Sequence, residues 1–131
     1  MKYKEINREN IILMVNTFYE QVREDAILSV IFDDIMKVDW EAHLPKIYDF
    51  WESVLLSTGA YKGNPMEVHI AISKIVKLEK PHFERWLELF KENAAKLFEE
   101  AQAKYITQKA FSIATLMEIK VNQYGNPKHI L

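Results

Sequence analysis

The sequence predicts an all-α protein, and three observations support that prediction. Apolar residues recur at helical spacing through most of the 131-residue chain, while the alternation typical of strands is weak. Only three glycines and four prolines occur, and they cluster between the periodic segments. Cysteine is absent, which excludes disulfides, zinc fingers and iron–sulfur clusters as the basis of the fold.

Length and composition narrow the class of protein further. The chain of 131 residues fits one domain spanning 1–131, and 49% hydrophobic residues suffice for one core and a cofactor cleft. The net charge is −2 and both signs are interspersed, so the sequence gives no sign of the basic surface that nucleic-acid binding requires. No apolar run approaches the ~18 residues of a membrane span, and the N-terminus lacks an apolar signal core. We therefore expect a soluble cytoplasmic protein without nucleic-acid or membrane partners.

The first predicted helix begins after Asn7, which is a suitable N-cap residue. Tyr19 lies at the edge of its apolar stripe, which consists of Ile11, Met14, Val15, Phe18 and Val22. Asp25 then marks the start of a short segment whose apolar residues also recur at helical spacing, namely Ile27, Leu28, Ile31 and Phe32.

The second predicted helix carries a histidine on an apolar face. Asp39 is placed to cap this helix, and Gly59 lies just past its end, where a left-handed residue is expected. His43 shares its stripe with large apolar side chains, namely Ile47, Phe50, Trp51 and Val54. Pro45 conflicts with a regular start at Trp40, because its ring would clash with a carbonyl of the preceding turn. Either the first turn is distorted or the regular helix begins near His43.

Two longer helices are predicted in the second half of the chain. Residues 57–65 have the composition of a loop, and one or two helical turns fit around 66–72. Pro81 suits the first turn of a long helix whose inward residues are Phe83, Trp86, Leu87, Phe90, Ala94, Leu97 and Phe98. A last helix from about Ala101 turns inward Tyr105, Ile106, Ala110, Ile113, Ala114 and Met117. The tail from about residue 122 contains breakers, and we expect it to fray.

The histidines are the residues with the clearest chemical potential. Burying an imidazole without a partner costs free energy, so His43 is either a hydrogen-bonded core residue or part of a ligand pocket. His69 fits either a metal ligand or a surface histidine, whereas His82 fits an exposed or capping role and His129 lies in the tail. Haem iron requires one axial imidazole and an otherwise apolar, aromatic wall. His43 and His69 could face each other across such a flat cofactor.

The order and spacing of these residues resemble class III truncated haemoglobins over most of the chain, from about Ile6 to Lys120. The matching motifs are Phe18-Tyr19 with Val22-Arg23, Ile31-Phe32, Trp40, His43-Leu44, Phe50-Trp51, Tyr61-x-Gly63-x-Pro65-Met66-x-x-His69 and His82-Phe83-x-Arg85-Trp86-Leu87. Glycine pairs at helix ends, which are usual in the other classes, are absent. The resemblance implies a globin-like sandwich of two helices over two helices around haem b, iron protoporphyrin IX.

The resemblance also implies roles for individual residues. His69 matches the proximal iron ligand, while Tyr19, His43 and Trp86 match residues that line the distal, gas-binding side. The remaining residues that the resemblance places around the haem are Phe32, Ile47, Phe50, Tyr61, Met66 and Phe90. Phe32 would wedge the haem, Met66 would lie on its proximal side, and Phe90 would form the pocket floor.

A phenol and an indole on the distal side bear on function. Both can donate to a ligand with partial negative charge, and each charge-assisted hydrogen bond contributes ~1.5–3 kcal/mol. Such a pocket favours tight, reversible binding of dioxygen or another diatomic gas, in oxygen or nitric-oxide chemistry, over diffusive oxygen transport. One alternative is a haem enzyme, either a nitric oxide dioxygenase or a peroxidase-like enzyme, which would need an unidentified reductase. The other is a haem-free helical adaptor. If Tyr19 and Trp86 have no ligand-binding role, they are core residues whose polar tips form hydrogen bonds with backbone groups.

Overall fold

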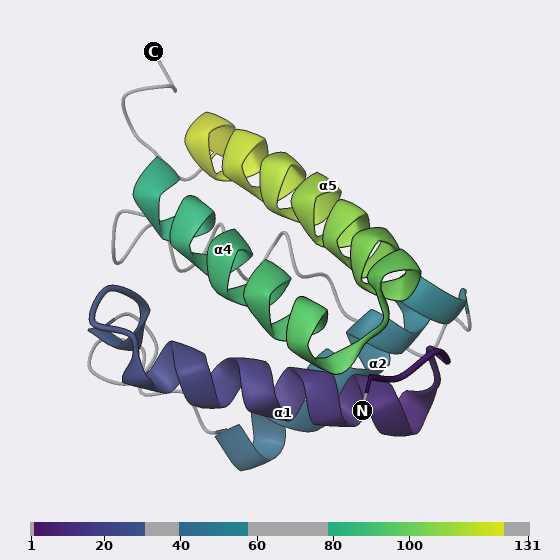
Figure 1. Cartoon of the computed structure of the whole chain (residues 1–131). Helices are drawn as coiled ribbons and strands as arrows, with labels where there is room; N and C mark the ends of the chain where they lie inside the picture. The colour runs from purple at the N-terminus through teal and green to yellow at the C-terminus, as the bar shows by residue number, and fades with distance from the viewer. Residues whose placement is uncertain (1, 31–39, 58–78, 125–131) are drawn as a thin grey trace.

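The computed structural model describes residues 2–30, 40–57 and 79–124, with side chains described as far as Ile119. Four long helices account for most of these residues (Figure 1): α1 (Arg8–Glu24), α2 (Trp40–Leu56), α4 (Lys80–Leu97) and α5 (Glu100–Tyr124). The described residues contain no strand longer than a single bridge between Tyr3 and Phe98. The all-α prediction is confirmed.

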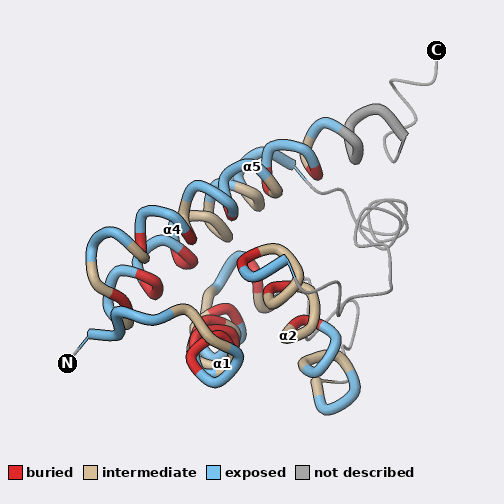
Figure 2. Tube along the Cα trace, turned by 90° about the vertical axis from the view of Figure 1, so that its right-hand side faces the viewer, coloured by how far each residue is buried: buried red, intermediate tan, exposed pale blue. Residues whose placement is uncertain are grey.

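The helices form two layers of two. Helix α1 packs on α2 and α4 packs on α5, while contacts from α1 to α4 and from α2 to α5 join the layers. The buried sides of the helices turn toward one another (Figure 2), and the core lies between the layers. This arrangement confirms the predicted two-over-two helical sandwich.

Helix α1 follows its sequence pattern closely. The Asn7 side chain accepts a hydrogen bond from the Asn10 backbone N–H at 2.8 Å, so the predicted cap is confirmed. All members of the predicted stripe are buried: Ile11, Met14, Val15, Phe18 and Val22. After the helix ends, the Asp25 carboxylate accepts from the backbone N–H groups of Ile27 and Leu28 at 3.1 and 3.0 Å. Of the apolar residues in this segment, Leu28 is buried, whereas Ile27 is 46% exposed.

Helix α2 begins at Trp40 and includes Pro45, so a start near His43 is excluded. Proline lacks the N–H that would bond to the Glu41 carbonyl. Glu41 and Pro45 are both exposed, and water can therefore satisfy that carbonyl. The inward side of α2 consists of Ile47, Trp51 and Leu55, with Phe50 and Val54 partly buried against it.

The end of α2 differs from the prediction. The helix stops at Leu56, and Ser57 has the positive φ, 56°, that was expected at Gly59. The Ser57 N–H still bonds to the Ser53 carbonyl at 3.0 Å, so this residue closes the last turn at the cost of a left-handed backbone. Gly59 and the predicted cap Asp39 lie outside the described residues.

Helix α4 has Pro81 in its first turn, as predicted. His82 has the capping role: its Nδ1 accepts from the Glu79 backbone N–H at 2.8 Å. The buried face of α4 includes Phe90 and Ala94, and also Leu89 and Asn93, which the predicted stripe omitted. Phe83 and Leu97 are only partly buried.

Helix α5 packs through small residues and Ile106, and its buried positions are Ala103, Ile106, Ala110, Ala114 and Met117. Tyr105 was expected inside but is 39% exposed, and its hydroxyl donates to the Leu55 carbonyl at 3.4 Å. The phenol is therefore positioned at the rim, where its polar tip reaches a helix end.

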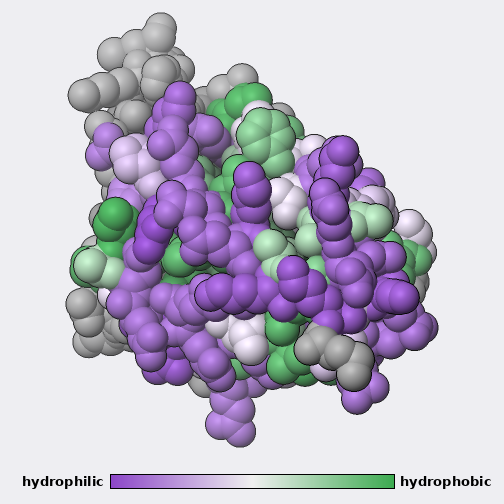
Figure 3. Space-filling view, viewed as in Figure 1, coloured by the Kyte–Doolittle hydropathy of each residue, from purple (hydrophilic) through white to green (hydrophobic). Residues whose placement is uncertain are grey.

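Within the described ranges, no helix is both long and apolar enough to cross a bilayer. Figure 3 shows one face of the molecule as mostly hydrophilic, interrupted by separate hydrophobic side chains.

Candidate functional site

A cluster of aromatic rings joins α1, α2 and α4 at the centre of the sandwich. Its members are Phe18, Tyr19, Trp40, Phe50, Trp51, Trp86 and Phe90, referred to below as the aromatic cluster. Phe18 packs edge-on against Trp86 and Phe90, with ring centroids 5.5 and 5.1 Å apart. Phe90 is stacked between Trp86 at 5.2 Å and Trp51 at 4.8 Å. Edge-on and stacked contacts of this kind fix the ring planes as well as burying apolar area.

Two polar groups meet within this apolar setting. The Trp86 indole lies close enough to the Tyr19 phenol to act on its pKa as a donor. An indole N–H can only donate, so it acts on the Tyr19 oxygen. Burial raises the pKa of Tyr19 to about 12, although the nearby Trp86 N–H acts in the opposite direction by favouring the phenolate. Tyr19 is therefore a neutral phenol at physiological pH.

Trp40 and His43 lie beside this pair, on the first turn of α2. The Trp40 ring is tilted against the Tyr19 ring at 5.1 Å, and His43 meets the Trp40 ring edge-on at 5.9 Å. The Arg23 guanidinium lies over the Trp40 ring, with its Cζ 5.4 Å from the centroid. The sequence patterns gave Trp40 and Arg23 no separate role. Arg23 lies one helical turn after Tyr19, and that spacing was the available signal that it shares a face with the phenol.

The structure brings together six of the predicted site residues, from three helices: Tyr19, His43, Ile47, Phe50, Trp86 and Phe90. Ile47 and Phe90 are buried, at 8% and 1% exposure, while Tyr19, His43, Phe50 and Trp86 are partly buried. The other predicted site residues, Phe32, Tyr61, Met66 and His69, lie outside the described residues.

Buried hydrogen bonds tie α1 to α4 close to the aromatic cluster. Asn93, only 2% exposed, donates through Nδ2 to the Met14 carbonyl at 3.0 Å and to Thr17 Oγ1 at 3.1 Å. Its Oδ1 accepts from Gln21 Nε2 at 3.0 Å. Asn93 lies one turn after Phe90 on α4, so these bonds set the register in which α4 presents Trp86 and Phe90 to α1.

Ion pairs join α1 to its two neighbours, α4 and α2, near the two ends of α1. Arg85 Nε donates to Asp25 at 2.7 Å, which links α4 to the end of α1. Burial alone would raise the pKa of Asp25, but hydrogen bonds from the Leu28 N–H and from Arg85 bring it below its ordinary value. At the other end of α1, Arg8 pairs with Asp49 and Glu52 of α2 at 3.0 and 2.8 Å. The pairs position α1 relative to both neighbours but contribute little stability individually where they are exposed.

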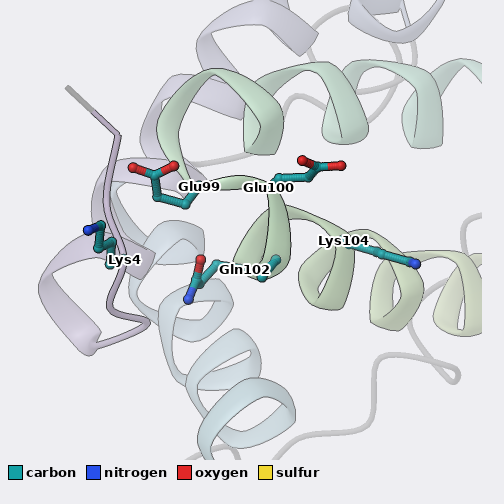
Figure 4. Close-up of a pocket in the computed structure, with 6 residues that line it drawn as sticks. Lys4, Glu99, Glu100, Gln102 and Lys104 are labelled. Carbon is teal, nitrogen blue, oxygen red and sulfur yellow. The ribbon is translucent and has the colours of Figure 1, made fainter.

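A hollow of about 520 Å³ lies elsewhere, between the N-terminal segment and the start of α5 (Figure 4). It is open to solvent and is lined by Lys4, Glu99, Glu100, Ala101, Gln102 and Lys104. Its mixed charges and lack of aromatic residues distinguish it from the aromatic cluster, and none of the predicted site residues lines it.

The two-over-two sandwich and the central phenol–indole pair define a helical protein built around an aromatic interior, as in the smallest globins. No family model matches the chain. It is 34% identical over 128 residues to the group 3 truncated hemoglobin ctb of Campylobacter jejuni, and the match covers 95% of this chain and 98% of that protein. The crystal structure of group III truncated hemoglobin from Campylobacter jejuni superposes with a TM-score of 0.83 at 35% identity, covering 96% of this chain and 99% of that one. The chain belongs to the group III truncated haemoglobins.

Proposed function

We propose that this protein binds haem b and reversibly binds dioxygen or another diatomic gas, with Tyr19 and Trp86 as hydrogen-bond donors on the gas-binding side. The observation behind the proposal is the approach of the Trp86 indole to the Tyr19 phenol inside an otherwise aromatic wall. A phenol and an indole N–H in one place are more than a packed core requires, because a buried polar group costs free energy that an apolar residue would not.

The described residues fit one side of a haem. Ile47 and Phe50 from α2 offer apolar surface, and Phe90 stacked under Trp86 forms a firm floor. Haem would supply an iron that binds an imidazole and a small gas ligand. By family resemblance we assign the imidazole to His69. We place His43 on the gas-binding side with Tyr19, and Phe32, Tyr61 and Met66 around the cofactor.

Tyr19 and Trp86 would act together on the ligand. The high pKa of Tyr19 keeps its phenol protonated, so the O–H can donate. The Trp86 indole N–H lies beside this phenol and can donate to the same ligand. In an apolar pocket each bond to a charge-bearing ligand contributes ~1.5–3 kcal/mol. These residues therefore favour slow ligand release, which suits oxygen or nitric-oxide chemistry better than oxygen transport.

The decisive experiment is stopped-flow measurement of dioxygen release from the haem-bound protein. Tyr19→Phe removes only the phenolic oxygen and should raise the release rate by roughly tenfold or more. Trp86→Phe should also raise it, and the double variant should show non-additive effects because both donors serve one ligand. Tyr105→Phe removes a rim phenol on α5 and should leave the rate unchanged. Unchanged release in both Tyr19→Phe and Trp86→Phe would remove the basis of the proposal.

Two other functions are distinguished by simple measurements. A haem-free adaptor would show no Soret absorption after expression with haem supplied, and membership in the truncated haemoglobins argues against it. A nitric oxide dioxygenase or peroxidase-like enzyme would turn over with a reductase, whereas a binding protein would exchange ligand without turnover. No feature of the described residues identifies such an electron donor.

A further inference from the structure

Trp40 covers Tyr19 from the start of α2. Its ring lies 5.1 Å from the Tyr19 ring at an interplanar angle of 50°, so it shields one side of the phenol ring. Trp40 lies in the first turn of α2, so its ring meets α1 from the beginning of that helix.

Two groups hold the Trp40 ring from different helices. Arg23 of α1 places its guanidinium over the ring at 5.4 Å, a cation–π contact. His43 of α2 lies edge-on to it at 5.9 Å, one turn further along the helix. Because Tyr19 and Arg23 lie one turn apart on α1, the phenol and the cation both contact this indole. Arg23 contacts Trp40, and Trp40 contacts Tyr19. The three residues thus connect an exposed charge to the partly buried Tyr19.

We propose that Trp40, held by Arg23, is a positioning residue that excludes water from Tyr19 and so sets the strength of its hydrogen bond to the gas ligand. The inference rests on the proposed function, because it acts only through the Tyr19 donor. Water that reached the phenol would compete for its O–H, and a hydrogen bond is worth less where water can replace it. Trp40 is bulky and apolar over most of its surface, which suits it to keep that side dry.

The test uses the haem-bound protein with dioxygen for release rates and carbon monoxide for the infrared stretch of the bound ligand. Trp40→Ala should raise dioxygen release by about threefold to tenfold, less than full removal of the phenol. It should also shift the carbon monoxide stretch in the same direction as Tyr19→Phe, a change that a purely structural role would not produce. Trp40→Phe retains an apolar ring and should restore most of both properties.

Arg23 provides a second variant that leaves the aromatic cluster intact. Arg23→Gln should raise release by a smaller factor than Trp40→Ala, and Arg23→Lys, which keeps a cation, should restore it. Phe111→Ala removes an aromatic residue that is 58% exposed on α5 and serves as the matched control, with no expected change in either readout. If Trp40→Ala fails to fold, the Arg23 pair and Trp40→Phe still decide the question.

The outcomes separate this inference from the proposed function. In a Tyr19→Phe background, Trp40→Ala should add no further increase in release, because the group it protects is gone. If Tyr19→Phe changes release but neither Trp40→Ala nor Arg23→Gln does, the positioning role is overturned while the donor role stands. If Tyr19→Phe itself has no effect, the proposed function fails first. An equal increase from Trp40→Ala with and without Tyr19 would show that the indole acts by another route, and would also overturn the inference.

Discussion

At Tyr19 two physical effects act in opposite directions on one proton. Burial disfavours the charged phenolate and raises the pKa, while the nearby Trp86 N–H stabilises the phenolate and lowers it. Burial is the larger effect, and the resulting pKa is about 12. The phenol therefore keeps its proton, and with it the capacity to donate, throughout the physiological range.

The high pKa predicts how ligand release responds to pH. The ratio of dioxygen release rates between Tyr19→Phe and the unaltered protein should stay constant from about pH 6 to pH 10, because the phenol remains protonated there. A change in the ratio centred between about pH 7 and pH 9 would show that the phenol ionises more easily than its surroundings imply.

The same proton also links Tyr19 to stability. Below about pH 10 the phenol is protonated in both the folded and the unfolded chain, so it contributes no pH dependence. Between about pH 10 and the folded pKa of about 12, the unfolded chain loses this proton while the folded chain keeps it, and stability falls as pH rises. Tyr19→Phe should lack that part of the alkaline decline, as urea titrations at several pH values would show.

A third prediction at the residue scale separates two histidines. His69→Ala should lose the imidazole-type haem spectrum, since we assign His69 as the proximal ligand. His82→Ala should keep the spectrum, because its Nδ1 caps α4 by accepting from the Glu79 N–H at 2.8 Å. Loss of that cap should lower the free energy of unfolding by about 0.5–2 kcal/mol. Retention of the spectrum in His69→Ala together with loss of haem in His82→Ala would reverse the assignment.

Among the contacts between elements, the one from α1 to α4 matters most for the site. It combines the rings of Phe18 and Phe90 with the buried hydrogen bonds of Asn93. Ring contacts alone allow helices to slide by small amounts, whereas hydrogen bonds to a fixed carbonyl and hydroxyl permit one register. We infer that Asn93 fixes the register and that the rings supply most of the buried apolar area.

Asn93→Ala tests this division of roles. Removal of the amide leaves Gln21 without its buried acceptor, and the free energy of unfolding should fall by about 1–3 kcal/mol. Because Trp86 lies two turns before Asn93 on α4, dioxygen release should also change. Gln108→Ala replaces an exposed polar residue on α5 and should alter neither quantity. Urea unfolding and stopped-flow release measure the two effects, and a variant as stable as the unaltered chain would contradict the register role.

The helices differ in how far their sequence specifies them. All members of the apolar stripe of α1 are buried, so periodicity identified its buried face except for Asn10, which is 8% exposed. Asn93 could not be recognised, because a polar residue becomes a favourable buried group only when another helix supplies its partners. The left-handed conformation of Ser57 was also missed. Glycine is the usual residue at such a position, so the sequence pointed to Gly59, and only the observed end of α2 shows that Ser57 has this conformation.

The candidate site, like the helices, could be predicted only in part from the sequence. Residue types and spacing selected Tyr19 and Trp86, yet the approach of the indole to the phenol depends on the packing of α1 against α4, which periodicity does not specify. Trp40 was recognised within the family pattern but received no role, because its contact with Arg23 joins two different helices. Sequence patterns thus predicted the helices and the chemical groups. The pairing of those groups required the tertiary structure.

For the molecule as a whole, the question is whether haem belongs to the core. The described core already contains closely packed side chains between the layers, including Phe18, Phe90 and Ile106, each no more than 1% exposed. Helix α5 contributes none of the rings of the aromatic cluster, whereas α2 offers Ile47 and Phe50 to the proposed cofactor. Haem should therefore stabilise the two layers unequally, with α2 depending on it more than α5.

Haem removal tests this expectation. A bound macrocycle would bury several hundred Å² of apolar surface at on the order of 25 cal/mol per Å², and a ligand that binds only the folded chain must raise its stability. The haem-bound protein should therefore melt at a higher temperature than the apoprotein. Amide hydrogen exchange should accelerate on haem extraction around Ile47 and Phe50 of α2 and change least around Ile106 and Ala110 of α5. Equal melting temperatures and unchanged exchange in α2 would mean that haem binds adventitiously, and the adaptor function would then have to be reconsidered.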